Sequence, residues 1–261
     1  MVELVDFSGN ANVYDRRHGA LLGDVLQRLA AAADLQPGVR LLDIGAGTGR
    51  VAVPLAGLGC EVVALEPATG MVKELRRKAG ATNVRVISGE GAHLPFGPAR
   101  FGAVVIARVL YLTPAWRDVL REASSVLAPG GRLLHEWANG ETDEPWVQIR
   151  EKARALFEQA GIDAPFHPGV RSEREVDEWL GTLGFARTAI LSTGPGPSLT
   201  LAEFLRRLID GEFSYIWKVP KHVQEECLPR LQSWAKHTFN LDETVSIPQE
   251  LHWAVYRKDA L

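Results

Sequence analysis

A glycine-rich turn between a short apolar run and an amphipathic segment constrains this chain more than any other feature. Residues 39–44 read VRLLDI, which is typical of a buried strand, and Gly45-Ala46-Gly47-Thr48-Gly49 follows directly. Glycines at alternate positions let the backbone turn tightly and let a ligand approach the main chain. Amides at the start of the next helix favour polar or anionic groups. The sequence predicts a strand–loop–helix unit that binds a ligand, with a plain glycine-rich turn as the alternative.

Apolar runs and helical periods alternate along the first half of the chain. Further strand-length runs cover residues 61–65, 84–87, 101–107 and 132–137. Apolar residues at spacings of three and four predict a helix over residues 116–127, which ends before Pro129-Gly130-Gly131. Such alternation indicates an α/β fold with a parallel sheet, whose strand-to-helix loops share one edge.

The second half is richer in tryptophan and in predicted helices. Helices are expected over residues 146–160 and from Ser172, which with Glu175 forms a capping-box pattern. Strands are expected at residues 185–191 and 251–257. The segment between them carries many aromatic residues and is predicted to be a helical insertion. A first helix is expected over residues 19–35.

The composition excludes several classes of protein. Lys and Arg total 29 against 32 Asp and Glu, a net charge of −3, so nucleic acid is not the expected partner. Cys60 and Cys227 are far apart, which supports neither a disulfide framework nor a zinc cluster. No metal is expected. The N-terminus does not resemble a secretory signal, and no apolar run is long enough to span a bilayer. The sequence therefore predicts a cytoplasmic protein.

An acidic residue follows the second apolar run. Glu66 lies about twenty residues beyond the glycine loop, where a carboxylate can accept hydrogen bonds from both hydroxyls of a ribose. The alternative is an acid favoured by the dipole of the helix after Pro67. Nicotinamide sites usually read GxGxxG, which would put a glycine at Arg50, whereas this loop reads GxGxG and follows Asp43.

These residues resemble the class I S-adenosylmethionine-dependent methyltransferases, specifically the small-molecule type related to the ubiquinone and menaquinone methyltransferases. The resemblance covers roughly residues 38–138. It implies a doubly wound, Rossmann-like α/β fold with a seven-stranded sheet whose last strand is antiparallel. Residues 1–261 would then form a single methyltransferase domain. Within it we expect an N-terminal helical lead (1–36), a cofactor-binding core (38–138) and a helical cap insertion between the last two strands (195–250).

The resemblance also implies which residues bind S-adenosyl-L-methionine. Glu66 is expected to hold the ribose and Met71 to pack on the adenine. Glu90 stands where an aspartate usually accepts a bond from the adenine amino group, and Arg108 ends the fourth strand beside the methyl donor. Gly102 departs from the family pattern, which has aspartate there. The full expected set is Asp43, Gly45, Ala46, Gly47, Glu66, Pro67, Met71, Glu90, Gly91, Ala92 and Arg108.

Methyl transfer requires alignment of the acceptor more than any particular side chain, so the sequence identifies no catalytic residue. A general base is needed only for a protonated acceptor, and the candidates by position are His18, His93 and His135. Tyr14 and Arg17 could close over the cofactor carboxylate. Arg108 could bind an acidic acceptor, or pair with Glu90 or another acid.

The predicted function is methyl transfer from S-adenosylmethionine to oxygen, nitrogen or carbon of a small organic molecule. An NAD-dependent oxidoreductase is the first alternative, and a protein that binds S-adenosylmethionine without turnover is the second. A small-molecule acceptor is the expected partner, with neither nucleic acid nor membrane. The oligomeric state stays open.

Overall fold

The computed structural model describes residues 7–18, 21, 23–80, 82–139, 144–162, 168–194, 196–247 and 250–260. The chain forms two compact units. The first, here called the sheet unit, comprises residues 7–137, 168–193 and 252–261. The second, here called the helical unit, comprises residues 1–6, 138–167 and 194–251. The glycine loop and Glu66 both belong to the sheet unit.

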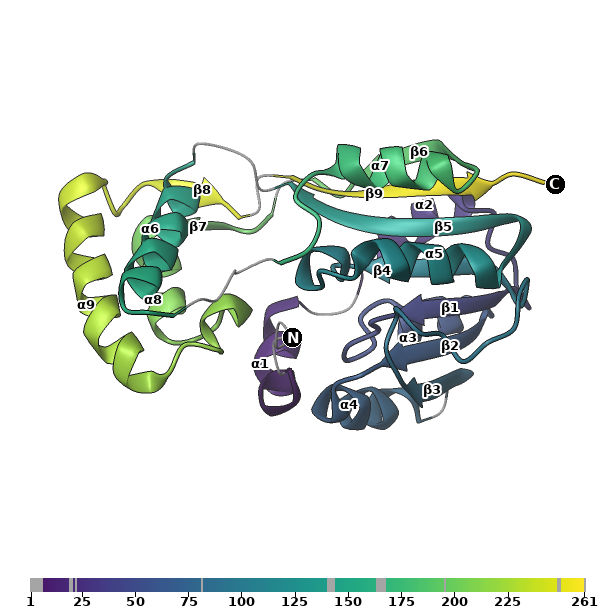
Figure 1. Ribbon diagram of the computed structural model, residues 1–261, viewed down its shortest axis with the longest axis horizontal. Coiled ribbons are helices and arrows are strands. Elements are labelled where there is room, and N and C mark those ends of the chain that lie inside the picture. Colours follow the sequence, from purple (N-terminus) through teal and green to yellow (C-terminus); the bar gives the residue numbers. More distant parts are fainter. Residues whose placement is uncertain are drawn as a thin grey trace. The chain divides into compact units, whose positions relative to one another are not determined.

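A seven-stranded sheet with the order β3-β2-β1-β4-β5-β9-β6 organises the first unit (Figure 1). The first five strands in chain order pair in parallel, and β9 is antiparallel to β6. This arrangement confirms the doubly wound α/β fold with an antiparallel last strand. The strand bounds are β1 Arg40–Ile44, β2 Glu61–Glu66, β3 Val84–Ser88, β4 Phe101–Ala107, β5 Leu127–Asn139, β6 Phe185–Ser192 and β9 Glu250–Lys258.

Helices cover both faces of this sheet (Figure 1). Because successive strand residues point to opposite faces, Leu41 packs with α2, α3 and α4, whereas Leu42 and Ile44 pack with α5 and α7. Because the parallel strands run in the same direction, their strand-to-helix loops all lie at one edge of the sheet. The helices are α1 Ala11–His18, α2 Gly23–Ala32, α3 Ala52–Gly57, α4 Thr69–Ala79, α5 Trp116–Val126 and α7 Glu173–Thr182, with short 3-10 turns η1 Ser8–Asn10 and η2 Leu110–Leu112.

The helix boundaries correct one prediction and confirm another. The predicted first helix over residues 19–35 is too long, because α2 covers only Gly23–Ala32 and residues 33–34 form a turn. Residues 19, 20 and 22 lie outside the described part of the chain. The predicted cap at Ser172 is confirmed: its side chain accepts a hydrogen bond from the Glu175 amide at the start of α7.

Pro129-Gly130-Gly131, before which the predicted helix ends, lies inside a strand. Helix α5 ends at Val126 and β5 begins at Leu127, which pairs with Phe101 of β4. The next pair joins Ala103 to Arg132, so the extra residues of β5 form an irregularity in the ladder. Gly130 has a φ of +73°, which glycine adopts without strain. The break in the sequence pattern therefore marks a bulge rather than a loop.

The helical unit has its own apolar core. Its elements are α6 Pro145–Gln159, α8 Leu201–Ile209, η3 Ser214–Ile216 and α9 Lys221–Thr238, together with a two-stranded ribbon of β7 Ser198–Thr200 and β8 Thr244–Ser246. The ring centroids of Phe204 and Phe213 lie 5.0 Å apart, and that of Trp146 lies 6.1 Å from Phe204. Most aromatic side chains of the expected insertion thus fill this core. Its role as a cap over an acceptor stays a prediction.

Candidate functional site

The glycine loop has the backbone that its sequence predicts. Gly45 and Gly47 have φ values of +71° and +56°, in the left-handed region that favours glycine. A side chain at residue 45 would overlap Val109, which follows β4, so the loop lies tightly against the end of that strand. Space is available at Gly47, where an added Cβ would meet, among the described residues, only Tyr14 Cε1 at 3.8 Å. The open side of the loop is therefore at Gly47.

Glu66 lies beside this open side of the loop. Its Oε2 accepts a hydrogen bond from the Gly47 amide and its Oε1 accepts one from the Ala68 amide, both at 2.9 Å. The residue is only 6% exposed. Burial raises the pKa of Glu66, and the two amide bonds oppose that rise. Each carboxylate oxygen keeps a further lone pair for a ligand hydroxyl.

Asp43 lies one residue before the end of β1 and is 1% exposed. Its Oδ2 has no hydrogen-bond partner among the described residues. Burial raises the pKa of Asp43 to about 7, against the effect of the positive charge of Arg50. A buried carboxylate oxygen without a donor is costly, and a ligand donor would relieve that cost.

Two arginines share one buried acid at the same edge of the sheet. Arg108 Nε lies 3.1 Å from Oε2 of Glu136, and Arg50 also pairs with this oxygen. All three side chains are largely buried. Arg108 has a φ of +60°, an uncommon and strained value for a residue with a side chain. Arg108 is expected from the sequence to bind an acidic acceptor or to pair with an acid of the chain, and the structure shows it paired with Glu136 of β5.

The N-terminal helix α1 fastens the loop to α4. Asp15 Oδ1 accepts a hydrogen bond from Thr48 Oγ1 at 2.7 Å and also pairs with Lys78. Burial opposes ionisation of Asp15, but the bonds from Lys78 and Thr48 outweigh it and lower its pKa. Tyr14 lies beside the loop, as expected, whereas the side chain of Arg17 lies outside the described part of the chain.

The residues expected around the adenine gather at the same edge. The Gly89 amide donates to the Glu66 carbonyl oxygen at 3.3 Å, which ties the loop after β3 to the end of β2. A side chain at Gly91 would lie 2.6 Å from Ile44 Cγ2, so this loop packs closely on β1. Met71 is buried, Ala92 is partly buried, and Pro67 and Glu90 are exposed. Their contacts with a cofactor stay predictions.

The candidate bases differ widely in exposure. His93 is exposed on the loop after β3, and the side chain of His18 lies outside the described residues. His135 on β5 is 2% exposed, and its Nδ1 has no hydrogen-bond partner among the described residues. Burial lowers the pKa of His135 to about 4. Nearby, His252 Nε2 lies 3.0 Å from Glu173 Oε1. The structure assigns a catalytic role to none of these.

Sequence reasoning missed Arg50, Glu136 and Asp15 as parts of this site. One signal for Glu136 was available, because a charged residue in the apolar run RLLHEW needs a buried partner. Arg50 directly follows the last glycine of the loop. For Asp15 the sequence holds no signal, since its partners are 33 and 63 residues away.

The comparisons with known proteins agree with this geometry. Residues 42–135 match the model of a family described as a methyltransferase domain. They include the glycine loop, Glu66 and the loop after β3. The similarity to a methyltransferase domain therefore rests on the same residues that build the candidate site.

Curated proteins with sequence similarity to this chain are also named methyltransferases. The chain is 36% identical over 133 residues to the demethylmenaquinone methyltransferase of Clavibacter sepedonicus, covering 49% of this chain and 54% of that protein. It is 33% identical over 150 residues to the nocamycin O-methyltransferase of Saccharothrix syringae, covering 51% and 54%. The chain spans about half the length of the curated relatives it matches.

A solved structure extends the likeness of fold. The putative methyltransferase of Bacillus halodurans superposes with a TM-score of 0.63 at 18% identity, over 91% of this chain and 100% of that one. The family model and the relatives support the small-molecule class I S-adenosylmethionine-dependent methyltransferase recognised from the sequence, and this neighbour supports its fold. They give no support to the oxidoreductase alternative.

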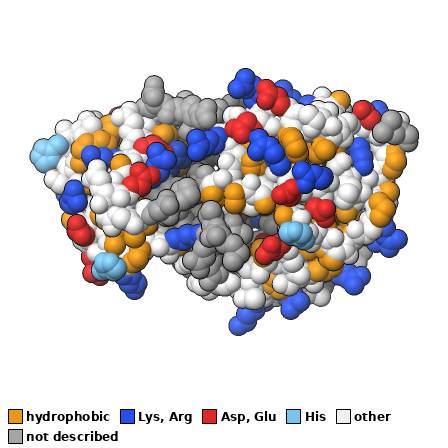
Figure 2. All heavy atoms as spheres, in the orientation of Figure 1, with side chains coloured by type: hydrophobic (Ala, Val, Ile, Leu, Met, Phe, Trp, Pro, Cys, Tyr) orange, Lys and Arg blue, Asp and Glu red, His pale blue; other side chains and the backbone are white. Residues whose placement is uncertain are grey.

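The described part of the chain contains no cluster of three or more His, Cys, Asp or Glu side chains placed to hold a metal ion. None of its helices combines the length and hydropathy that a membrane span needs. On the face drawn in Figure 2, Lys and Arg side chains alternate with Asp and Glu. This mixed surface agrees with the small net charge.

Proposed function

We propose that the sheet unit binds S-adenosyl-L-methionine and transfers its methyl group to a small organic molecule. The observation that carries this proposal is the Glu66 carboxylate, held by two amides beside the open side of the glycine loop. In this arrangement a ribose can bind the acid while an amino-acid tail runs along the loop. The proposed site comprises the residues named from the resemblance, together with Arg50.

The residues present suit the chemical groups of this cofactor. Asp43 Oδ2 is a buried acceptor with no donor among the described residues, which suits an ammonium group or a bound water. Arg50 and Arg108 both pair with Glu136 at this edge, and guanidinium groups are well suited to bind a carboxylate. Glu66 keeps acceptor capacity for ribose hydroxyls. The three charged parts therefore complement an amino acid joined to a nucleoside.

When bound, the cofactor supplies a methyl group on positively charged sulfur, which is already activated toward a nucleophile. The protein residues then have to orient the two reactants and exclude water. Alignment of this kind contributes about 7–11 kcal/mol to the lowering of a barrier. Main-chain groups from Asp43 to Gly49 hold the donor in one position, and the tight packing of Gly45 on Val109 fixes that loop.

The acceptor is proposed at the level of its class. The names of the two relatives refer to demethylmenaquinone and to O-methylation of nocamycin, both small organic molecules. We extend only that class to this chain, with oxygen, nitrogen and carbon all retained as acceptor atoms. The cytoplasm is the proposed compartment, and no nucleic-acid or membrane partner is proposed.

The test measures binding and turnover separately. In calorimetric titrations the full chain should bind S-adenosylmethionine and its demethylated product, and NAD should give no heat. Donor labelled in the methyl group should then label at least one member of a panel of phenols, quinols and amines. Binding of NAD alone would overturn the proposal. Tight cofactor binding without labelling of any acceptor would favour the non-catalytic alternative.

A further inference from the structure

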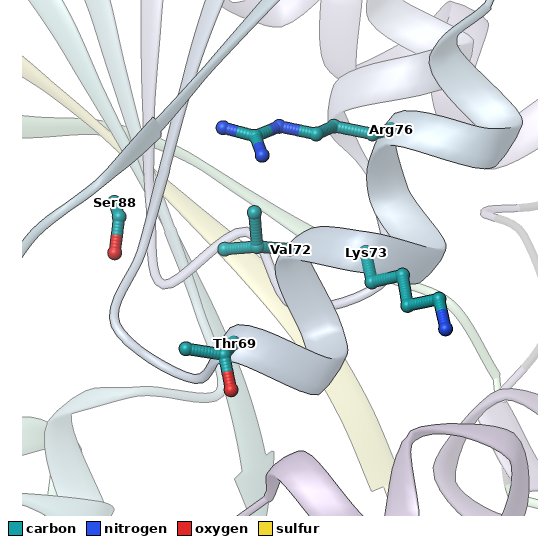
Figure 3. A pocket seen from close by; sticks show the side chains of 5 residues that line it. All are labelled: Thr69, Val72, Lys73, Arg76 and Ser88. Atoms are coloured by element: carbon teal, nitrogen blue, oxygen red, sulfur yellow. The ribbon is translucent and has the colours of Figure 1, made fainter.

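The structure contains a hollow whose lining residues differ from those proposed to bind the cofactor. It has a volume of about 300 Å³ and lies in the sheet unit between α4 and the end of β3. Its lining is Thr69, Val72, Lys73, Arg76 and Ser88 (Figure 3). The α4 residues recur at spacings of three and four, so they share one face of the helix. The volume is at the lower end of the range for small-molecule sites.

The cations of this hollow differ from the other basic residues of α4. Arg77 pairs with a glutamate three residues earlier, and Lys78 pairs with the aspartate of α1. Within the part of the chain that the structure describes, Lys73 and Arg76 have no ion-pair partner. The basic side chains that line the hollow are thus those left without a carboxylate.

The side chains that line the hollow point in different directions. Figure 3 shows the Arg76 guanidinium extended above Val72 toward the wall that holds Ser88, whereas the Lys73 ammonium points away. Thr69 stands on the remaining side, with its Oγ1 3.3 Å from Ser8 Oγ. Hydroxyl groups both donate and accept hydrogen bonds, and a guanidinium presents a planar set of donors that matches an oxyanion. The lining therefore offers donors of charged and neutral kinds.

We propose that this hollow binds a phosphate group, held by Arg76 and by the hydroxyl of Ser88, with Lys73 adding positive charge from outside. Ser88 is the register partner of Glu66 between β3 and β2. The phosphate would therefore lie next to the proposed ribose position without using the same residues. Nothing in the proposed methyl transfer requires this group.

The experiment measures thermal unfolding of the full chain in phosphate against chloride at equal ionic strength. Inorganic phosphate should raise the midpoint of the wild-type protein. Arg76→Gln should weaken the apparent affinity about tenfold, since it removes the main charged donor, and Lys73→Gln about two- to threefold. Arg77→Gln, whose cation already has a partner, is the matched control and should bind like the wild type. Glycerol 3-phosphate in a second series distinguishes a phosphate ester from the free ion.

Three outcomes would overturn the inference. Phosphate could leave the midpoint unchanged, or Arg77→Gln could lose as much affinity as Arg76→Gln, which would indicate only the general charge of α4. Competition between phosphate and S-adenosylmethionine would assign the hollow to the cofactor's own site. Because phosphate binding is measured first without cofactor, its failure is distinguishable from failure of the proposed methyl transfer.

Discussion

Glu136 and His135 are neighbours on β5, yet the two faces of the sheet accommodate them in opposite ways. Glu136 pairs in register with Ala107 and lies on the face of α2, α3 and α4, whereas His135 lies on the face of α5 and α7. They are 3% and 2% exposed. Glu136 receives two guanidinium groups, but His135 Nδ1 has no partner among the described residues and burial lowers its pKa. The buried Glu136 is thus stabilised by ion pairs on one face of the sheet, whereas the buried His135 stays neutral on the other.

The largest expected effect concerns the ion-paired face. Glu136→Gln keeps the shape of the side chain but leaves two buried guanidiniums without a carboxylate. We expect it to lower the free energy of unfolding by about 3–5 kcal/mol. Glu61→Gln is the control, because that acid is exposed and lies 3.9 Å from Arg40. Urea denaturation at neutral pH measures both, and equal losses in the two variants would contradict the account.

Asp43 sharpens the comparison, because it lies on the ion-paired face and yet one of its oxygens has no partner in the part of the chain that the structure describes. Its pKa is about 7 in the folded protein against a reference of 3.8. Because this raised pKa favours the protonated carboxyl in the folded state, Asp43 contributes stability that is fully present below pH 3.8. This contribution is lost as the pH rises through about 7. Between about pH 5 and about pH 8 the loss should be about 2.7 kcal/mol. Asp43→Asn should remove this part of the pH dependence, measured by denaturation across that range.

His135 should show the opposite dependence on pH. Its pKa is lowered from 6.5 to about 4, so the folded state favours the neutral ring and stability is lost as the pH falls below 6.5. Down to about pH 5 the loss should be about 2 kcal/mol. His135→Asn should remove this loss of stability at low pH, whereas His93→Asn, a change of an exposed histidine, should leave it unchanged. A slope that survives unchanged in His135→Asn would contradict this account.

The positions of the parallel strands and the conformation of the glycine loop could be predicted because their signals are local. Residues 39–49 contain both a buried strand and the glycines that turn it, and Glu66 ends the next strand. Both features depend on a few consecutive residues. The same reasoning found the cap at Ser172.

Features that depend on distant residues could not be predicted. The pairing of Arg50 with Glu136 joins residues 86 positions apart, and Asp15 links two elements that the sequence does not connect. Residues 138–167 belong with 194–251 in one unit, although the chain between them returns to the sheet. Periodicity reports which residues are buried but not which segments bury them together.

The central claim is that Glu66 binds the ribose of S-adenosylmethionine. Titration calorimetry of Glu66→Gln beside Glu61→Gln, an exposed acid on the same strand, tests it most directly. With both folds intact by circular dichroism, Glu66→Gln should weaken binding by about 1.5–3 kcal/mol, which corresponds to about 10- to 150-fold, and the control should bind normally. An unchanged dissociation constant in Glu66→Gln would contradict the account.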